Sequence, residues 1–187
     1  MDEALSQACS ALQARVGELR YDVVSSDDGQ VEIRAELDPV AILGLFFAET
    51  FSAGGLKIQV HLEHQEEVLS GELTGTDVGL LTASGGRGLD ALQYLSNRVL
   101  NRRLQQHAPV HLDCGGFKER RAEQLEEQAV AAADEALRRG APVQMGPLTP
   151  AARRVVHLAL ADDPDVETES DGEGFLKRLF VRPVRRR

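Results

Sequence analysis

Apolar residues at the start of the chain recur at helical spacing and then switch to alternation. A helix over residues 3–19 is predicted, because apolar side chains three or four positions apart share one helix face. Its apolar positions are Leu5, Ala8, Leu12, Val16 and Leu19. The runs RYDVV and VEIRAEL predict two strands with Asp28-Gly29 as the hairpin turn, since glycine tolerates the positive φ that the turn needs.

The middle of the chain predicts a helix, two strands, a long helix and a short strand. Asp38 and Pro39 have the properties of a helix N-cap and first residue, so a helix over about 40–52 should follow. Alternation predicts strands over 56–62 and 68–73, and PVHLD predicts another. The long helix should turn Leu89, Leu92, Leu95, Val99 and Leu104 inward and Asn97, Arg98, Asn101 and Arg102 outward.

The last third predicts two helices and three strands, the first of which is the short run VQM. KERRAEQLEEQAVAAADEALRRG should form a helix that ends at Gly140, with Asp134–Arg138 and Glu135–Arg139 spaced for ion pairs. Thr149 and Pro150 are suited to begin the next helix. Strands near 166–170 and 176–182 complete an α+β fold with a small mixed or antiparallel sheet.

Charge is unevenly distributed along this chain of 187 residues and net charge −9. Residues 1–38 hold 9 acidic and 3 basic side chains, whereas residues 148–187 hold 7 and 8 and end in a basic tail of Lys177, Arg178, Arg182 and Arg185–Arg187. With element order, this predicts three parts: an acidic α-β-β unit over 1–38, a second part over 39–115, and a third over 116–187.

The composition favours a globular protein of the cytoplasm. An apolar fraction of 42% supports a core, and no apolar run is long enough to cross a bilayer. The start MDEALSQACS lacks the pattern of a signal peptide. Cys9 and Cys114 lie far apart and are expected to be reduced thiols.

Arg153 and His157 are the first candidates for chemistry. Four positions apart on a helix, they share one face, and the apolar residues Val155, Val156, Leu158 and Leu160 are expected to face the core. A forked guanidinium beside an imidazole suits a phosphate. The alternative is structural: an arginine paired with a carboxylate and a histidine satisfied within the fold. Spacing alone favours this alternative, because R-x-x-x-H often occurs by chance.

A glycine-rich stretch before the long helix is the second candidate. Gly85, Gly86, Arg87 and Gly88 form a G-x-x-G, and unpaired amides at a helix N-terminus can hold an anion. Folds of the KH type grip a single strand with such a loop. Most glycine clusters are merely turns.

Other chemistry is not favoured by the sequence. His61 and His64 fall on opposite faces of a strand, as do His111 and Cys114, so neither pair suits a metal. Phosphate-loop, dinucleotide, nucleophile-elbow and zincin motifs are missing from the sequence. A run of acidic residues is better interpreted as a solvated loop and strand edge than as a Mg²⁺ site; it consists of Asp162, Asp163, Asp165, Glu167 and Glu169. We therefore expect no enzyme, cofactor or metal.

Three long blocks of the sequence, over about residues 39–183, resemble successive parts of one bacterial family. The blocks are GLDALQYLSNRVLNRR, GGFKERRAEQL and LTPAARRVVHLALADDPDVETESDGEG. They are similar to the helix after the G-x-x-G loop, the connecting helix and the R-x-x-x-H (R-three-H) domain of the Jag family, the sporulation-protein-J-associated proteins also called KhpB or EloR. This resemblance favours a binding role for Arg153 and His157.

The resemblance implies a type II KH domain over 39–115 followed by an R-three-H domain that binds single-stranded RNA or DNA. It also implies a cytoplasmic RNA chaperone or regulator that works with a small KH-domain partner protein and influences cell elongation and envelope synthesis, including cell shape and cell wall biogenesis. The family often carries a separate N-terminal domain on a longer linker. Residues 1–37 are compact, acidic and directly joined, so no function is carried onto them.

The glycine-rich loop departs from the family pattern. Aligned on LDALQYL, the family's G-x-x-G falls on Ala83-Ser84-Gly85-Gly86, so its first glycine and its basic pair are absent. Either Gly85 to Gly88 acts as a clamp shifted by two residues, or this domain holds RNA weakly and its surface serves pairing with another protein.

We therefore expect a single-stranded nucleic-acid-binding protein, with RNA as the favoured partner. The expected binding residues are Arg153, His157, Arg154, Lys177, Arg178, Arg182, Gly85, Gly86, Arg87, Gly88, Arg98 and Arg102. Lys177, Arg178 and Arg182 would join Arg153 if they face the same side, with the acidic loop at the rim limiting adhesion to duplex. The alternative is a protein-interaction adaptor with a degenerate KH surface, and a homodimer fits either function.

Overall fold

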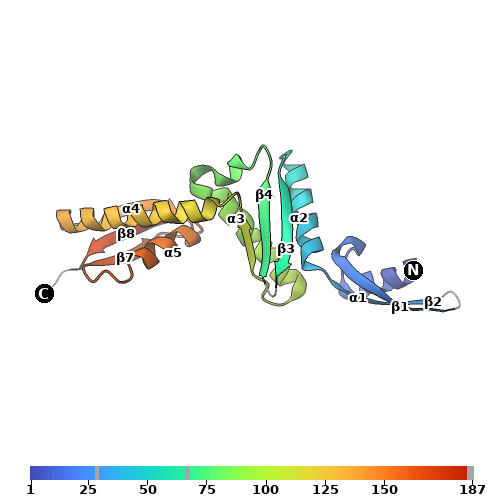
Figure 1. Cartoon of the computed structure of the whole chain (residues 1–187). Coiled ribbons are helices and arrows are strands. Elements are labelled where there is room, and N and C mark those ends of the chain that lie inside the picture. The colour runs from blue at the N-terminus through green and yellow to red at the C-terminus, as the bar shows by residue number, and fades with distance from the viewer. Residues whose placement is uncertain (28–29, 66–67, 185–187) are drawn as a thin grey trace. The chain divides into compact units, whose positions relative to one another are not determined.

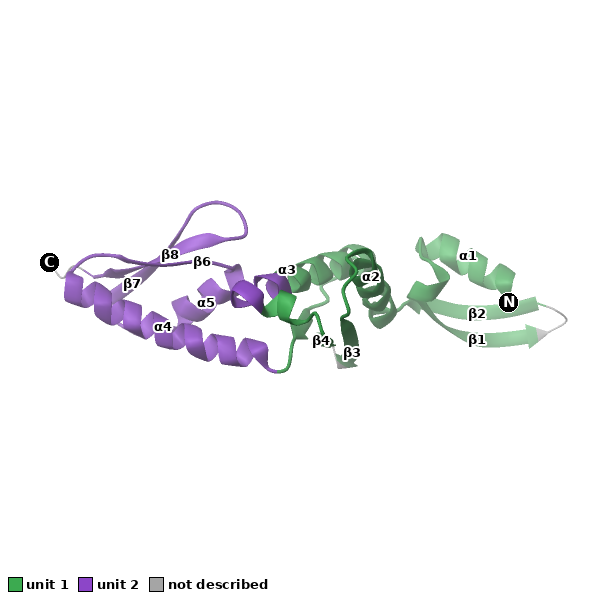
Figure 2. Ribbon diagram, turned by 90° about the horizontal axis from the view of Figure 1, so that it is seen from above, with its two compact units in different colours: residues 1–82, 91–115 green, residues 83–90, 116–187 purple. Residues whose placement is uncertain are grey.

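The computed structural model describes residues 1–27, 30–65 and 68–184. It forms two compact units: residues 1–82 and 91–115 are unit 1, and residues 83–90 and 116–187 are unit 2 (Figure 2). This differs from the three parts predicted from charge and element order. Residues 1–38 pack within unit 1, and residues 83–90 pack with the last part of the chain.

Unit 1 begins with a helix and a hairpin. The elements are α1 (Asp2–Leu12), the 3₁₀ helix η1 (Val16–Glu18), β1 (Leu19–Asp27) and β2 (Gln30–Leu37), and the two strands are antiparallel (Figure 1). The first helix is shorter than predicted, because Gln13 takes a left-handed conformation with φ 49° and ends it. The predicted turn at Asp28-Gly29 lies outside the described residues, as do the last three residues of the predicted basic tail, 185–187.

The remainder of unit 1 packs helices on a three-stranded sheet. Helix α2 (Pro39–Ala53) begins as predicted, because Asp38 Oδ1 accepts from the backbone N–H of Val40 at 2.8 Å. The sheet contains β3 (Gln59–Gln65), β4 (Val68–Thr74) and β5 (Val110–Asp113), with β4 in the centre. Strand β4 runs antiparallel to β3 and parallel to β5.

Amide side chains of α3 (Gly79–Leu104) occupy the outer edge of β5. Gln93 Oε1 accepts from the backbone N–H of Leu112 at 2.9 Å, and Asn97 Oδ1 accepts from that of Val110 at 3.0 Å. Asn101 Oδ1 accepts from the next segment, at Ala108, at 2.9 Å. We call these three residues the amide ladder. Their spacing of four places them on one helix face.

The ladder corrects the predicted faces of α3. Asn97 and Asn101 were expected to point outward, but their amides bond the backbone beside β5. Leu95 was expected to face inward and is 50% exposed. Polar residues face the sheet here because the edge strand offers N–H groups that need acceptors.

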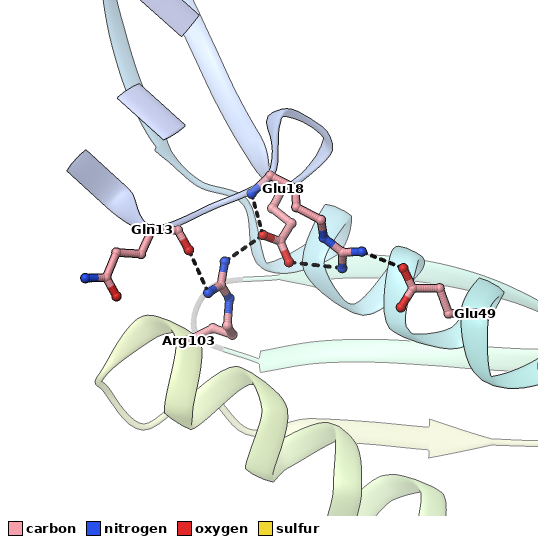
Figure 3. Close-up of polar contacts among 5 residues, drawn as sticks. Gln13, Glu18, Glu49 and Arg103 are labelled. Atoms are coloured by element: carbon pink, nitrogen blue, oxygen red, sulfur yellow. Dashed lines mark hydrogen bonds and ion pairs between the residues drawn. The ribbon is translucent and has the colours of Figure 1, made fainter. Parts of the chain in front are cut away.

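A buried carboxylate joins η1 to α2 and α3 (Figure 3). Glu18 is 6% exposed and pairs with the Arg103 guanidinium at 2.6 Å. The backbone N–H of Arg15 donates to Glu18 at 2.9 Å, while the Arg15 side chain pairs with Glu49 at 2.5 Å. Arg103 also donates to the carbonyl of Gln13 at 3.0 Å. Burial alone would raise the pKa of Glu18, but these hydrogen bonds and charges outweigh it, and the pKa is lowered.

Unit 2 packs two helices against one face of an antiparallel sheet. Its elements are α4 (Phe117–Arg139), β6 (Val143–Leu148), α5 (Pro150–Ala159), β7 (Val166–Asp171) and β8 (Lys177–Pro183), with strand order β6-β8-β7 (Figure 1). The core is formed by Leu125, Ala129, Ala132, Ala133, Ala136, Leu148, Val156, Leu160, Val166, Leu179 and Val181. The small alanine side chains allow α4 to lie close to the sheet.

Candidate functional site

The start of α5 is fixed by Thr149. Its Oγ1 accepts from the backbone N–H of Ala152 at 3.2 Å and donates to Asp90 Oδ2 at 2.5 Å. Pro150 follows at the first helical position, as the sequence predicted. One capping hydroxyl therefore sets the rotation of the helix that carries Arg153 and His157.

Arg153 is anchored through a single nitrogen. Its Nη1 donates to the carbonyl of Leu148 at 3.0 Å and to that of Phe175, in the loop between β7 and β8, at 3.3 Å. The side chain is half-buried, and no carboxylate in the described ranges lies within ion-pair distance of it. The described residues therefore do not support the structural alternative, in which Arg153 pairs with a carboxylate. The guanidinium is held in place and keeps N–H groups for a ligand.

His157 lies between two hydroxyl groups of β7. Its Nδ1 is 2.5 Å from Oγ1 of Thr168, and its Nε2 is 3.1 Å from Oγ of Ser170. A neutral imidazole donates through one ring nitrogen and accepts through the other. One hydroxyl must therefore accept from the ring, which leaves its own O–H free to donate elsewhere. The histidine thus orients a hydroxyl donor rather than offering a bare ring nitrogen.

The imidazole is kept neutral by its surroundings. Burial lowers the pKa of His157 below the ordinary 6.5, and the positive charge of Arg153 lowers it further. Because this pKa is depressed in the folded state, His157 stabilises the fold at a pH above the ordinary pKa of 6.5. That contribution is lost as the pH falls through the lower folded pKa.

The substitution Arg153→Gln is expected to raise the pKa of His157 while leaving it below the ordinary 6.5. The charge of Arg153 is removed, but burial, the larger cause, stays. An NMR titration of the imidazole measures this, with Arg154→Gln on the exposed side of α5 as the control. An unchanged titration in Arg153→Gln would show that the two side chains are not electrostatically coupled.

The basic residues of β8 do not all share the face of Arg153. Leu179 and Val181 are buried toward the helices, so Lys177 lies on that face and Arg178 and Arg182 lie on the other. The condition that all three face the side of Arg153 is met by Lys177 and not by the two arginines, because side chains alternate along a strand.

Arg182 is engaged on its own face of the sheet. It pairs with Glu169 at 2.7 Å and lies 5.7 Å from the ring centroid of Phe180. The carboxylate of Glu169, on the neighbouring strand β7, thus pairs with the Arg182 side chain that was expected to bind RNA.

One apolar residue of α5 also departs from expectation. Leu158 is 63% exposed, whereas Val156 and Leu160 fill the core and half-buried Val155 packs against it. Arg154 is exposed, so its charge can attract an anion over a long range.

The glycine-rich loop lies within α3, one helical turn from its start. Ala83 is extended, and Ser84, Gly85 and Gly86 have φ of 53°, 77° and 82°. Arg87 and Gly88 already have helical geometry, so only Gly85 and Gly86 of the predicted Gly85–Gly88 clamp belong to the left-handed loop. Three consecutive left-handed residues interrupt the helix, and glycine adopts that conformation without a Cβ penalty.

Arg98 and Arg102 are exposed on α3 in unit 1. They lie four positions apart and therefore share one helix face. Their charges are open to an anion at this surface.

Sequence reasoning missed Thr168 and Ser170. They lie two and four positions after buried Val166 in β7, so the period of two places all three on the helix-facing side of the strand. Only the packing of α5 on β7 shows that they meet His157. In the described part of the chain, no three His, Cys, Asp or Glu side chains gather as metal ligands, and no helix is long and apolar enough to span a membrane.

Comparison with known proteins identifies relatives of this chain. The model of the R-three-H domain matches residues 123–183. RNA-binding protein KhpB of Clostridium symbiosum is 32% identical over 195 residues, which cover 97% of this chain and 87% of that protein. The KhpB of Bacillus subtilis strain 168 is 26% identical over 153 residues, covering 81% and 74%. That of Lactiplantibacillus plantarum is 35% identical over 106 residues, covering 57% and 33%.

Proposed function

The chain belongs to the KhpB family, whose members carry the name of RNA-binding proteins, and from this premise we propose that it binds single-stranded RNA through its R-three-H domain. Phosphate docks at α5 and β7, beside Arg153 and His157. The observation that carries the proposal is an anchored guanidinium with no carboxylate partner in the described ranges, one helical turn from a hydroxyl–imidazole–hydroxyl group.

Each group has a separate task in the proposed complex. Arg153 spends Nη1 on two carbonyls, so Nε and Nη2 remain to form a charged pair with phosphate oxygens. His157, held neutral, fixes Thr168 and Ser170 so that one hydroxyl donates to the ligand. Lys177, on the same face of β8, and exposed Arg154 add attraction over a longer range.

Other parts of the proposal depend on family resemblance rather than on this geometry. They are a type II KH domain that contacts RNA through Arg98 and Arg102, a small KH-domain partner protein and a cytoplasmic location. A role as a non-catalytic RNA chaperone in cell elongation and envelope synthesis belongs to the same set. Copurification of a stoichiometric protein partner without nucleic acid would favour the adaptor alternative instead.

The affinity for an unstructured RNA oligonucleotide is expected to fall as salt rises. Each neutralised phosphate of a single strand contributes a slope of about −0.7 to log K against log salt, so three contacts give roughly −2. Fluorescence anisotropy of a labelled oligonucleotide over a salt series measures the slope. Photocrosslinking of the bound RNA should label peptides of α5 and β7.

A flat salt response would contradict phosphate contacts as the main source of affinity. A duplex of the same length serves as the control. It should bind more weakly, because Asp162, Asp163 and Asp165 follow α5 directly and repel a second phosphate backbone. Crosslinks confined to unit 1 would place the RNA elsewhere.

A further inference from the structure

The left-handed loop of α3 packs against α4 within unit 2. A Cβ at Gly86 would lie 2.4 Å from Cε1 of Phe117, so the ring rests directly on the glycine backbone. Gly86 is buried, whereas Ala83 and Ser84 are exposed. Phe117 therefore supports one side of the loop, and the side around Ser84 stays open to solvent.

Arg121 lies one turn along α4 from Phe117, next to the neighbouring glycine. A Cβ at Gly85 would be 3.1 Å from Nη2 of Arg121 and 3.4 Å from its Nε. A side chain at position 85 would thus displace the guanidinium. The sequence thus has glycine at the loop position that lies beside the guanidinium.

The charge of Arg121 has no counterpart among the residues that the structure describes. Its Nε is buried without a hydrogen-bond partner, and no carboxylate in those ranges pairs with the side chain. Arg138 and Arg139, on the same helix, both pair with Glu135. A partly buried guanidinium without a partner is costly, and an anion beside it removes that cost.

The loop itself lacks the charge that a phosphate site needs. Its exposed position is occupied by Ser84, and the only basic residue next to it in the chain is Arg87, exposed in the first turn of the following helix segment. The N-terminus of that segment adds a partial positive charge. Arg121 brings a full charge to the same loop from a different element.

We propose that Arg121 of α4, together with the backbone of Ser84–Gly86, forms a second phosphate site, which takes the RNA backbone in place of a basic pair within the loop. This inference rests on the proposed RNA binding. The guanidinium fork pairs with phosphate oxygens from the open side, while Phe117 holds the loop in its left-handed conformation. The site belongs to unit 2, which also carries Arg153, so one strand contacts two arginines of the same unit.

The substitution Arg121→Gln in the full chain tests the site by the salt dependence of RNA binding. The slope of log K against log salt should become shallower by about 0.7, and the Kd at low salt should rise about tenfold. Arg121→Lys should keep the slope, because it keeps the charge. Arg139→Gln removes the same charge from the same helix and should leave both quantities unchanged. Circular dichroism and thermal unfolding establish that each variant is folded.

The outcomes separate this inference from the proposed function. If wild type binds RNA and Arg153→Ala weakens binding, but folded Arg121→Gln keeps the wild-type slope, the second site is overturned and the site at Arg153 stands. If wild type shows no RNA binding, both are overturned. An equal loss of slope in Arg139→Gln would reveal a general charge effect and also overturn the specific site.

Discussion

Replacing Arg153 and His157 together by alanine should weaken binding of an unstructured RNA oligonucleotide about 100-fold, since two hydrogen-bonding positions at a charged phosphate are lost. The first substitution removes the charged guanidinium fork, and the second removes the imidazole that orients the hydroxyls of Thr168 and Ser170. Fluorescence anisotropy at one fixed salt concentration measures the change in Kd.

The double variant should remain folded, because the core of unit 2 does not use either side chain. Arg139→Ala is the control for loss of positive charge, since it pairs with Glu135 away from the site. Arg153→Lys keeps the charge but loses the anchored fork, and its affinity should be intermediate. Wild-type affinity in a correctly folded double variant would rule out α5 as the RNA contact.

Replacing Arg103 by methionine should destabilise unit 1 by about 3 kcal/mol, because the buried carboxylate of Glu18 loses its main charge partner. The carbonyl of Gln13 loses its donor at the same time. Urea unfolding of the variant, followed through hydrogen exchange of α1 and the β1–β2 hairpin, measures the change. Arg102→Met, at the exposed neighbouring position, should have little effect.

The pH dependence of this stability has a defined sign. The pKa of Glu18 is lowered in the folded state, so its contribution is present above the ordinary value of 4.5 and is lost as the pH falls through the lower folded pKa. Arg103→Met should weaken this acid dependence, because Arg103 supplies one of the charges that lower the pKa. An Arg103→Met chain with wild-type stability would mean that Arg15 alone compensates the carboxylate.

Local signals in the sequence predicted the ends of several elements. Asp38, Thr149 and Gly140 cap helices as expected, because a cap depends on one side chain or one left-handed residue and the few residues next to it. Alternation predicted strands over 56–62 and 68–73, and the structure has β3 at Gln59–Gln65 and β4 at Val68–Thr74. The family blocks predicted the R-three-H domain that matches residues 123–183.

The signals in the sequence did not predict the contacts between elements. Arg178 and Arg182 looked equivalent to Lys177, yet the parity of β8 sends them to the other face of the sheet. Thr168 and Ser170 meet His157 only because of the register of β7 and the rotation of α5. Arg121 reaches Gly85 because of how α4 packs on a loop more than thirty positions earlier in the sequence.

The amide ladder has a consequence for how unit 1 meets other chains. Open strand edges recruit foreign strands, and this is a common route to aggregation and to partner binding. Gln93, Asn97 and Asn101 occupy the N–H groups of Val110 and Leu112 and the backbone just before them, so recruitment at β5 is blocked. Because β3 is the other end of the sheet order, any growth of this sheet by an incoming strand must start there.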